Sequence, residues 1–157
     1  MKQSRAAALA IGAVLAAAVT GGSFGPQQPR AAAWYATLRK PSYTPPGPAI
    51  AAAWGVLDIL LCVTGYRLLR QASSRNRTTA LGCWGGCLAG LAGFPAAFFG
   101  LRRLGPSTAP SGGMFASAAG TAVAASRIDP VAAAASMPLV LWTGFATFLS
   151  EELWRRN

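Results

Sequence analysis

The sequence contains little charge. Only 11% of its 157 residues are charged, four of them acidic, and 53% are hydrophobic. An average soluble domain has about a quarter of its residues charged. This scarcity of charge excludes an ordinary soluble domain and indicates a protein embedded in a membrane.

Histidine is absent altogether, and the three cysteines, Cys62, Cys83 and Cys87, all lie within apolar runs. Cys83 and Cys87 are four residues apart, a spacing that suits a metal only if other ligands converge. Without histidine, neither a zinc site nor histidine-ligated haem is expected. The sequence also lacks a close pair of carboxylates and a phosphate-binding loop. We therefore predict no catalytic residue, no metal site and no required cofactor.

Long apolar runs fill the chain instead, each close to the roughly 20 residues that a helix needs to cross a bilayer. They cover about residues 6–22, 48–69, 79–100, 104–126 and 131–153. We expect an all-α polytopic membrane protein, a bundle of five transmembrane helices that forms one domain over residues 1–157. The sequence leaves open which membrane holds it.

The first apolar run and the run 104–126 differ from ordinary transmembrane helices. Lys2 and Arg5 precede an Ala-rich core in the first run, as in a signal peptide; because the rest of the chain is also apolar, a retained helix is the simpler account. The run 104–126 contains Pro106, Pro110 and a glycine pair, which are poor in a helix interior. We expect that helix to pack tightly but to be short, kinked or late to start.

The net charge of +10 would indicate nucleic acid in a soluble protein. Here the cations flank the apolar runs, where they act as membrane anchors. We therefore expect the lipid bilayer, and not nucleic acid, as the partner of these cations. Seven cations fall on each side, which leaves the positive-inside rule undecided. They are Lys2, Arg5, Arg67, Arg70, Arg75, Arg77 and Arg127 on one side, and Arg30, Arg39, Lys40, Arg102, Arg103, Arg155 and Arg156 on the other.

The connection at residues 30–47 differs from a flexible spacer. Its segment WYATLRKPSYTPP combines Trp34 and Tyr35 with two cations and prolines that include Pro45. The rings favour the membrane–water interface and the prolines resist helix. We interpret the segment as a structured, lid-like cap, in which Trp34 and Tyr35 serve as lid residues, as interface anchors, or as both.

Two helix faces carry rings at helical spacing. One consists of Pro138, Trp142, Phe145, Ala146 and Leu149, and the other of Cys83, Cys87, Leu91, Phe94 and Phe98. Such faces could enclose an apolar cavity, although a stripe of this kind is more often ordinary bundle packing than pocket lining.

Asp58 is the one acidic residue well inside an apolar run, one turn beyond Trp54. A carboxyl group within a membrane is a functional candidate by default. Three roles stay open for Asp58: binding a polar group of a ligand, carrying a proton, or a protonated, hydrogen-bonded contact between helices.

The ordered set of these blocks resembles the TspO/MBR family, the translocator proteins, also called peripheral benzodiazepine receptors or tryptophan-rich sensory proteins. The resemblance covers roughly residues 20–157. It rests on WYATLRKPSYTPP followed eight residues later by Trp54 in AAAWGVL, on LGCWGGCLAGLAGFPAAFFGLRR from Leu81, and on RIDPVAAAASMPLVLWTGFATFLSEELWRRN from Arg127.

The resemblance implies a five-helix membrane protein, often a homodimer, whose first connection covers a pocket for porphyrins, haem and sometimes sterols or synthetic drugs. We therefore expect a sensor or carrier that binds a tetrapyrrole or another flat apolar molecule. The alternatives are an enzyme that degrades or photo-oxidises porphyrin, and a small transporter with Asp58 as proton site. The expected ligand-binding residues are Trp34, Tyr35, Pro45, Trp54, Asp58, Cys87, Leu91, Phe94, Phe98, Pro138, Trp142, Phe145, Ala146 and Leu149.

The chain departs from the family at positions that bear on ligand choice. Such a pocket would be more apolar than is usual, which puts inherited specificity in question. The carboxyl end, LSEELWRRN, also lacks the tyrosine of a proposed cholesterol motif and contains two Glu–Arg pairs four apart, which we expect to form ion pairs. This chain has Cys87 and Leu91 where the family usually has Gln and Asn, and Phe94 where Trp is usual. It has Leu139 and Ser150 where Tyr and Asn are usual, and Asp58 where Tyr is common.

Overall fold

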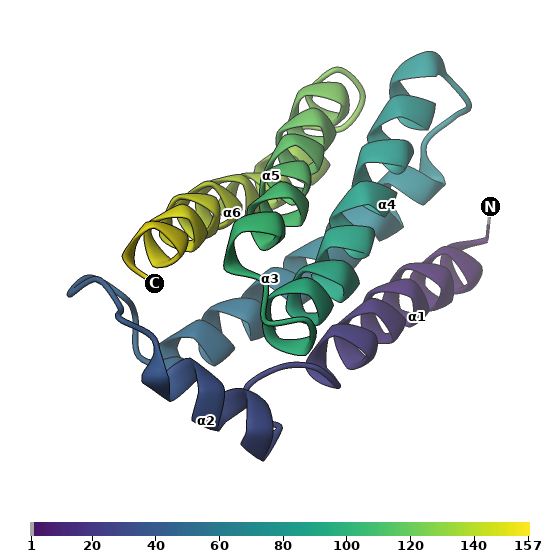
Figure 1. The fold of residues 1–157 in the computed structure, drawn as a ribbon. Helices are drawn as coiled ribbons and strands as arrows, with labels where there is room; N and C mark the ends of the chain where they lie inside the picture. Colours follow the sequence, from purple (N-terminus) through teal and green to yellow (C-terminus); the bar gives the residue numbers. More distant parts are fainter. Residues whose placement is uncertain (1) are drawn as a thin grey trace.

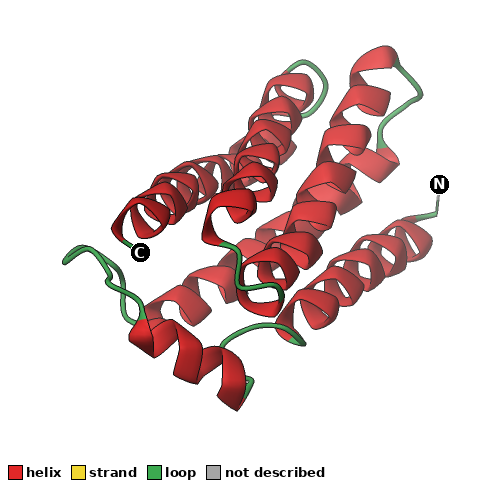
Figure 2. Cartoon of the chain, in the orientation of Figure 1, coloured by secondary structure: helices red, strands yellow, loops and turns green. Residues whose placement is uncertain are grey.

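The structure is a computed structural model that describes residues 2–157, and these form a bundle of helices without a strand (Figures 1 and 2). Each long helix coincides with an apolar run of the sequence, because a helix satisfies all its backbone hydrogen bonds internally, as lipid requires. In chain order the elements are α1 (Gln3–Gly22), α2 (Pro29–Thr37), α3 (Gly47–Arg70), α4 (Arg75–Pro95), a π-helix η1 (Ala96–Gly100), α5 (Leu104–Ser126) and α6 (Pro130–Arg156).

The all-α prediction is confirmed, but the count of five helices is wrong. A sixth helix, α2, forms inside the connection that was expected to resist helix. Its proline, Pro29, stands at the first helical position, where a missing N–H costs nothing, and an alanine run follows. Among the described residues four helices are long and apolar enough to cross a membrane, namely α1, α3, α4 with η1, and α6.

The remaining long helix, α5, is 23 residues long but is not one of these four candidate spans. It begins at Leu104, so the expected late start and short length are wrong. Pro106 falls in its first turn, where the missing N–H has no helical partner to lose. Ser107 and Thr108 donate their hydroxyls to the carbonyls of Leu104 and Gly105 at 2.7 Å, so both hydroxyls have partners within the first turns of the helix.

The long helices form a ring. Going round it, α1 packs on α3, α3 on α6, α6 on α5, α5 on α4 and α4 on α1 (Figure 1). Small residues allow the closest approaches: a Cβ atom on Gly90 would lie 2.6 Å from the Met114 side chain, and one on Gly120 would lie 2.7 Å from the Cys83 sulfur. Close packing of this kind replaces the hydrophobic driving force that is missing between helices in lipid.

Pro95 explains the π-helix. Proline has no N–H to give to the carbonyl four residues back, that of Leu91, and its ring crowds that carbonyl, so the α-helix ends there and continues as η1. The Leu91 carbonyl instead lies against Gly21 of α1, where any side chain would collide with it. As a result, η1 presents Phe98 and Phe99 to the end of the bundle that carries α2.

The two ends of the bundle differ. We call the end formed by α2, the start of α3, η1 and the end of α6 the lid end; the other carries the α3–α4 and α5–α6 connections and the start of α1 (Figure 1). Asn157 makes two hydrogen bonds with the backbone of Arg39, which places the end of α6 beside the lid connection.

Candidate functional site

The lid helix α2 is fastened to η1 by aromatic rings. Trp34 lies edge-on to Phe98 and Phe99, with ring centroids 5.5 and 6.3 Å apart, and Tyr35 approaches the same two rings at 6.2 and 5.8 Å. Phe94 stacks on Phe98 at 5.4 Å. Edge-to-face and offset contacts of this kind stabilise beyond the apolar area they bury. Together these rings form a second small core at the lid end, with Leu149 and Leu153 beneath them.

The loop after α2 makes further contacts with α6. Tyr43 stacks on Phe148 with centroids 6.0 Å apart. The Arg39 N–H donates to the side-chain oxygen of Asn157 at 2.9 Å, and the Asn157 amide donates back to the Arg39 carbonyl at 3.2 Å. Lys40 lies over the Tyr35 ring at 4.6 Å, and burial raises the pKa of the Tyr35 phenol above its ordinary value. The connection therefore has defined contacts along its length, as a lid would.

Below the lid, α3 and α6 meet through a pair of tryptophans. The rings of Trp54 and Trp142 lie edge to face with centroids 6.4 Å apart, and Phe145 lies 6.0 Å from Trp142. All three side chains are half-buried. The two tryptophans that the sequence singled out, 88 positions apart, thus meet at one helix interface.

Close in sequence to these two tryptophans, α3 and α6 each carry a buried polar atom that a ligand could engage. The indole N–H of Trp142 and the Oδ1 atom of Asp58 are buried and have no hydrogen-bond partner among the described residues. Asp58 lies one turn after Trp54 on α3. A buried polar group without a partner costs about 1–3 kcal/mol, so an indole donor and a carboxyl acceptor here are groups that a bound molecule could satisfy.

Cys87 and Leu91, by contrast, lie in the main core. Cys87 is fully buried and Leu91 nearly so, among residues of α1, α3, α5 and α6 that include Leu139. The cavity beside Cys87 has a volume of ≈10 Å³, about what one water molecule needs. The cavity next to Cys87 is therefore far smaller than a tetrapyrrole.

The structure brings the expected site residues together in three places. The lid cluster contains Trp34, Tyr35, Phe94, Phe98, Phe145 and Leu149, the α3–α6 interface contains Trp54 and Trp142, and the main core contains Cys87 and Leu91. Asp58 lies one turn beyond Trp54 on α3. Pro138 is exposed on the outside of α6, and Pro45 and Ala146 are half-buried.

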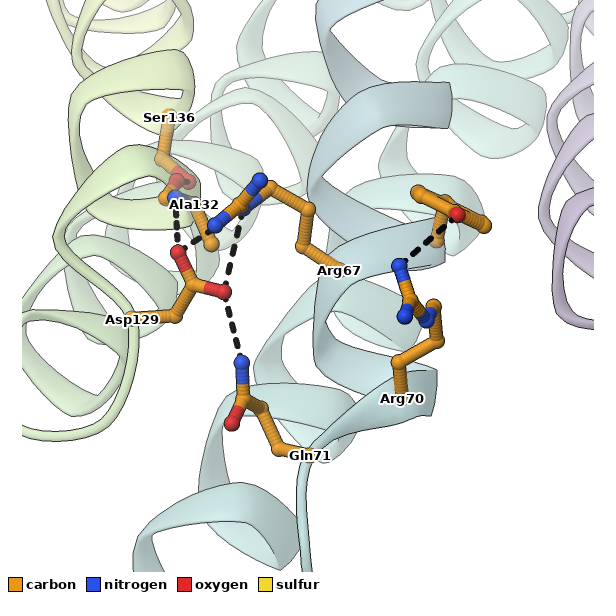
Figure 3. Close-up of polar contacts among 7 residues, drawn as sticks. Arg67, Arg70, Gln71, Asp129, Ala132 and Ser136 are labelled. Carbon is orange, nitrogen blue, oxygen red and sulfur yellow. Dashed lines mark hydrogen bonds and ion pairs between the residues drawn. The ribbon is translucent and has the colours of Figure 1, made fainter. Parts of the chain in front are cut away.

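A polar cluster at the opposite end was missed in the sequence. Asp129 is 3% exposed and caps α6, accepting the N–H of Ala132 at 3.0 Å. Arg67 of α3 donates to both its oxygens at 2.8 and 3.0 Å, and Gln71 donates at 2.6 Å (Figure 3). Burial alone would raise the pKa of Asp129, but these hydrogen bonds and the guanidinium charge lower it overall. The Asp-Pro pair that opens α6 was the available signal, since Asp is a favoured N-cap and Pro a favoured first residue.

The two ion pairs expected at the end of α6 are present. Arg155 contacts Glu151 at 2.6 Å and Arg156 contacts Glu152 at 3.0 Å. Both pairs are substantially exposed, so each contributes only a few tenths of a kcal/mol. They finish the helix and do not shape the site.

These features define a class: a polytopic integral membrane protein in which a short aromatic helix packs at one end of the bundle and two tryptophan-bearing helices contact each other. More particularly, the chain belongs to the TspO/MBR family, whose family model matches residues 10–155. This confirms the resemblance inferred from the motifs.

Named relatives come from animals and bacteria. The translocator protein of Bos taurus is 33% identical over 144 residues, which is 87% of this chain and 83% of the relative. Protein CrtK of Rhodobacter capsulatus is 31% identical over 90% of this chain and 86% of its own length. The tryptophan-rich sensory protein of Cereibacter sphaeroides is 29% identical over 79% and 77%.

Proposed function

We propose that this protein binds a tetrapyrrole, a porphyrin or haem, between α3 and α6 beneath α2, and acts in the membrane as its sensor or carrier. The observation that carries the proposal is the tryptophan pair, Trp54 and Trp142, in contact at 6.4 Å with an unpartnered indole N–H and the unpartnered Asp58 carboxyl beside it. Flat conjugated rings stack on flat conjugated ligands.

Chemically, these residues suit a ligand held by stacking. The chain has no histidine to ligate iron, and the Cys87 side chain is fully buried in the main core. The walls are aromatic, and the Trp142 N–H and the Asp58 oxygen supply one donor and one acceptor to orient a ligand. The two indoles contact each other in the ligand-free protein. A bound ligand would separate them, and its own contacts with the rings would replace their edge-to-face contact.

Entry of a ligand requires movement of the lid. Trp34 and Tyr35 hold α2 on Phe98 and Phe99, and Asn157 holds the following loop through Arg39. Each is a small contact at an end of the bundle and does not belong to the main core. The lid can therefore detach at a lower free-energy cost than unfolding the bundle.

The test is a titration of the purified full chain with protoporphyrin, followed by the absorbance of the porphyrin. Wild-type protein should saturate at one equivalent. Replacing both Trp54 and Trp142 by Phe should weaken binding about tenfold, because each indole contact is worth about 0.5–1.5 kcal/mol. The matched control is Trp154→Phe, an exposed indole outside the α3–α6 contact, which should bind as wild type does.

An equal affinity in the double variant and the control would reject the tryptophan pair as the binding site. The same titration under illumination tests the enzymatic alternative, since an enzyme would convert more than one equivalent of porphyrin to a new chromophore. A binder reaches one equivalent and stops.

A further inference from the structure

A second concave region lies at the lid end, away from the tryptophan pair. It is an open groove of ≈500 Å³ between the end of α1, the start of α2 and the connection from η1 to α5. This volume lies within the range of ordinary small-molecule sites. Its walls include the rings of Phe24 and Phe99, the cations Arg30 and Arg102, and the polar side chains of Ser23 and Gln28.

The two arginines in this groove have no anionic partner. Among the described residues the ion pairs are Arg67–Asp129, Arg155–Glu151 and Arg156–Glu152, and neither Arg30 nor Arg102 donates a side-chain hydrogen bond. The acidic residues of the lid end are already taken by neighbours on α6. The groove therefore presents two free guanidinium groups, the donors best suited to a phosphate.

Arg102 also has an unusual backbone. Its φ angle is 53°, the one positive value at a non-glycine position in the part of the chain that the structure describes. A glycine would adopt this conformation freely, whereas an arginine is strained in it. Backbone strain at a residue without an internal partner fits a role for its side chain.

Close in sequence to the groove, α1 carries exposed apolar side chains. Leu15 and Val19, one turn apart, are 57% and 71% exposed, and Phe24 follows at the groove wall with its ring against Gly100. Since α1 is a candidate span that ends at Gly22, the groove opens at the level of the lipid headgroups. An acyl chain can lie along α1 while its headgroup occupies the groove.

We propose that this groove is a specific site for one anionic phospholipid, with its phosphate between Arg30 and Arg102 and its acyl chain against Phe24 and the outer face of α1. Charge selects an anionic over a zwitterionic lipid, because a zwitterionic headgroup brings its own cation to the two guanidinium groups. The site is independent of the tryptophan pair and of what binds there.

Native mass spectrometry of the full chain in detergent, titrated with phosphatidylglycerol or phosphatidylcholine, tests this proposal. One phosphatidylglycerol should bind in preference to phosphatidylcholine. Arg30→Gln and Arg102→Gly should each weaken its affinity about fivefold, the effect of one cation near a phosphate, and together about twentyfold. Arg103→Gln, next to Arg102 but outside the groove lining, is the matched control and should bind as wild type does.

Arg102→Gly separates binding from folding, because glycine relieves the strained backbone while removing the cation. It should keep or raise the thermal stability of the lipid-free protein and still lose lipid affinity. Equal losses in Arg103→Gln and the groove variants would show only a general surface charge effect and overturn the site. Displacement of the lipid by an equal concentration of inorganic phosphate would identify a small-anion site and overturn the lipid assignment.

Discussion

At the scale of single residues, Asp129 shows how one side chain connects two helices. Its carboxylate caps α6 through Ala132 and receives Arg67 and Gln71 from the end of α3. Because it is 3% exposed, removing it leaves a helix cap unfilled and a guanidinium without its partner. The α3–α6 contact, which also contains the tryptophan pair at its other end, is fixed at this point.

Replacing Asp129 by Ala should lower the free energy of unfolding by about 2 kcal/mol, because it removes a helix cap and charge-assisted hydrogen bonds while the 38% exposed Arg67 can be hydrated. Asp129→Asn should cost about 1 kcal/mol, because an amide oxygen can still cap the helix. Unfolding in detergent, followed by circular dichroism, measures both. An alanine variant as stable as wild type would show that water replaces the carboxylate fully.

The same carboxylate gives stability a pH dependence. The pKa of Asp129 is lower in the folded protein than its ordinary value of about 3.9, so the unfolded chain binds more protons in that range. Its stabilisation is therefore complete above about pH 4 and is lost as the pH falls through the folded pKa. The stability difference between wild type and Asp129→Asn should shrink over that window.

At the scale of elements, α3 and α4 are held together by a glycine against a tryptophan. The Trp84 indole donates to the Leu61 carbonyl of α3 at 3.0 Å, and its ring lies against Gly65, where a Cβ atom would come within 2.7 Å of the ring carbon Cε2. Trp84 is 8% exposed, so the ring has little room to move.

Gly65→Ala should therefore destabilise the protein by about 2 kcal/mol, as overpacking of a filled core does. Gly55→Ala on the same helix is the matched control. A Cβ atom at Gly55 meets nothing within 4 Å, so the added methyl should be neutral or slightly stabilising. Thermal unfolding of both variants measures the difference, and equal melting temperatures would mean that Trp84 moves aside without cost.

The sequence predicts where the long helices lie but not which helices contact each face. Apolar runs located the long helices, because hydrocarbon thickness and helical rise fix their length. The regular spacing of Cys87, Leu91, Phe94 and Phe98 did not predict which side chains surround these residues. Neighbours contact α4 from α1, α3 and α5, so a regular spacing identifies a face but not which neighbour covers it. The bulge at Pro95 then turns Phe98 toward the lid cluster, while Cys87 stays in the main core.

At the scale of the whole molecule, the cations are balanced between the two ends. Arg30, Arg39, Lys40, Arg102, Arg103, Arg155 and Arg156 lie at the lid end, and Lys2, Arg5, Arg67, Arg70, Arg75, Arg77 and Arg127 lie at the opposite end. The structure thus keeps the seven-to-seven division that the sequence indicated. Since the excess of lysine and arginine near the spans sets orientation, this division gives little preference for either side.

Small changes in charge should therefore reorient the protein. Replacing Arg39 and Arg103 by Gln leaves five cations at the lid end against seven, which should turn the lid end away from the cytoplasm. Lys2→Gln with Arg5→Gln is the mirror variant and should turn it inward. Reporter fusions after Asn157, at the lid end, measure the outcome: alkaline phosphatase is active outside, and a fluorescent protein fluoresces inside. Opposite shifts in the two variants would assign orientation to cation balance, whereas one orientation in both would assign it to the helices themselves.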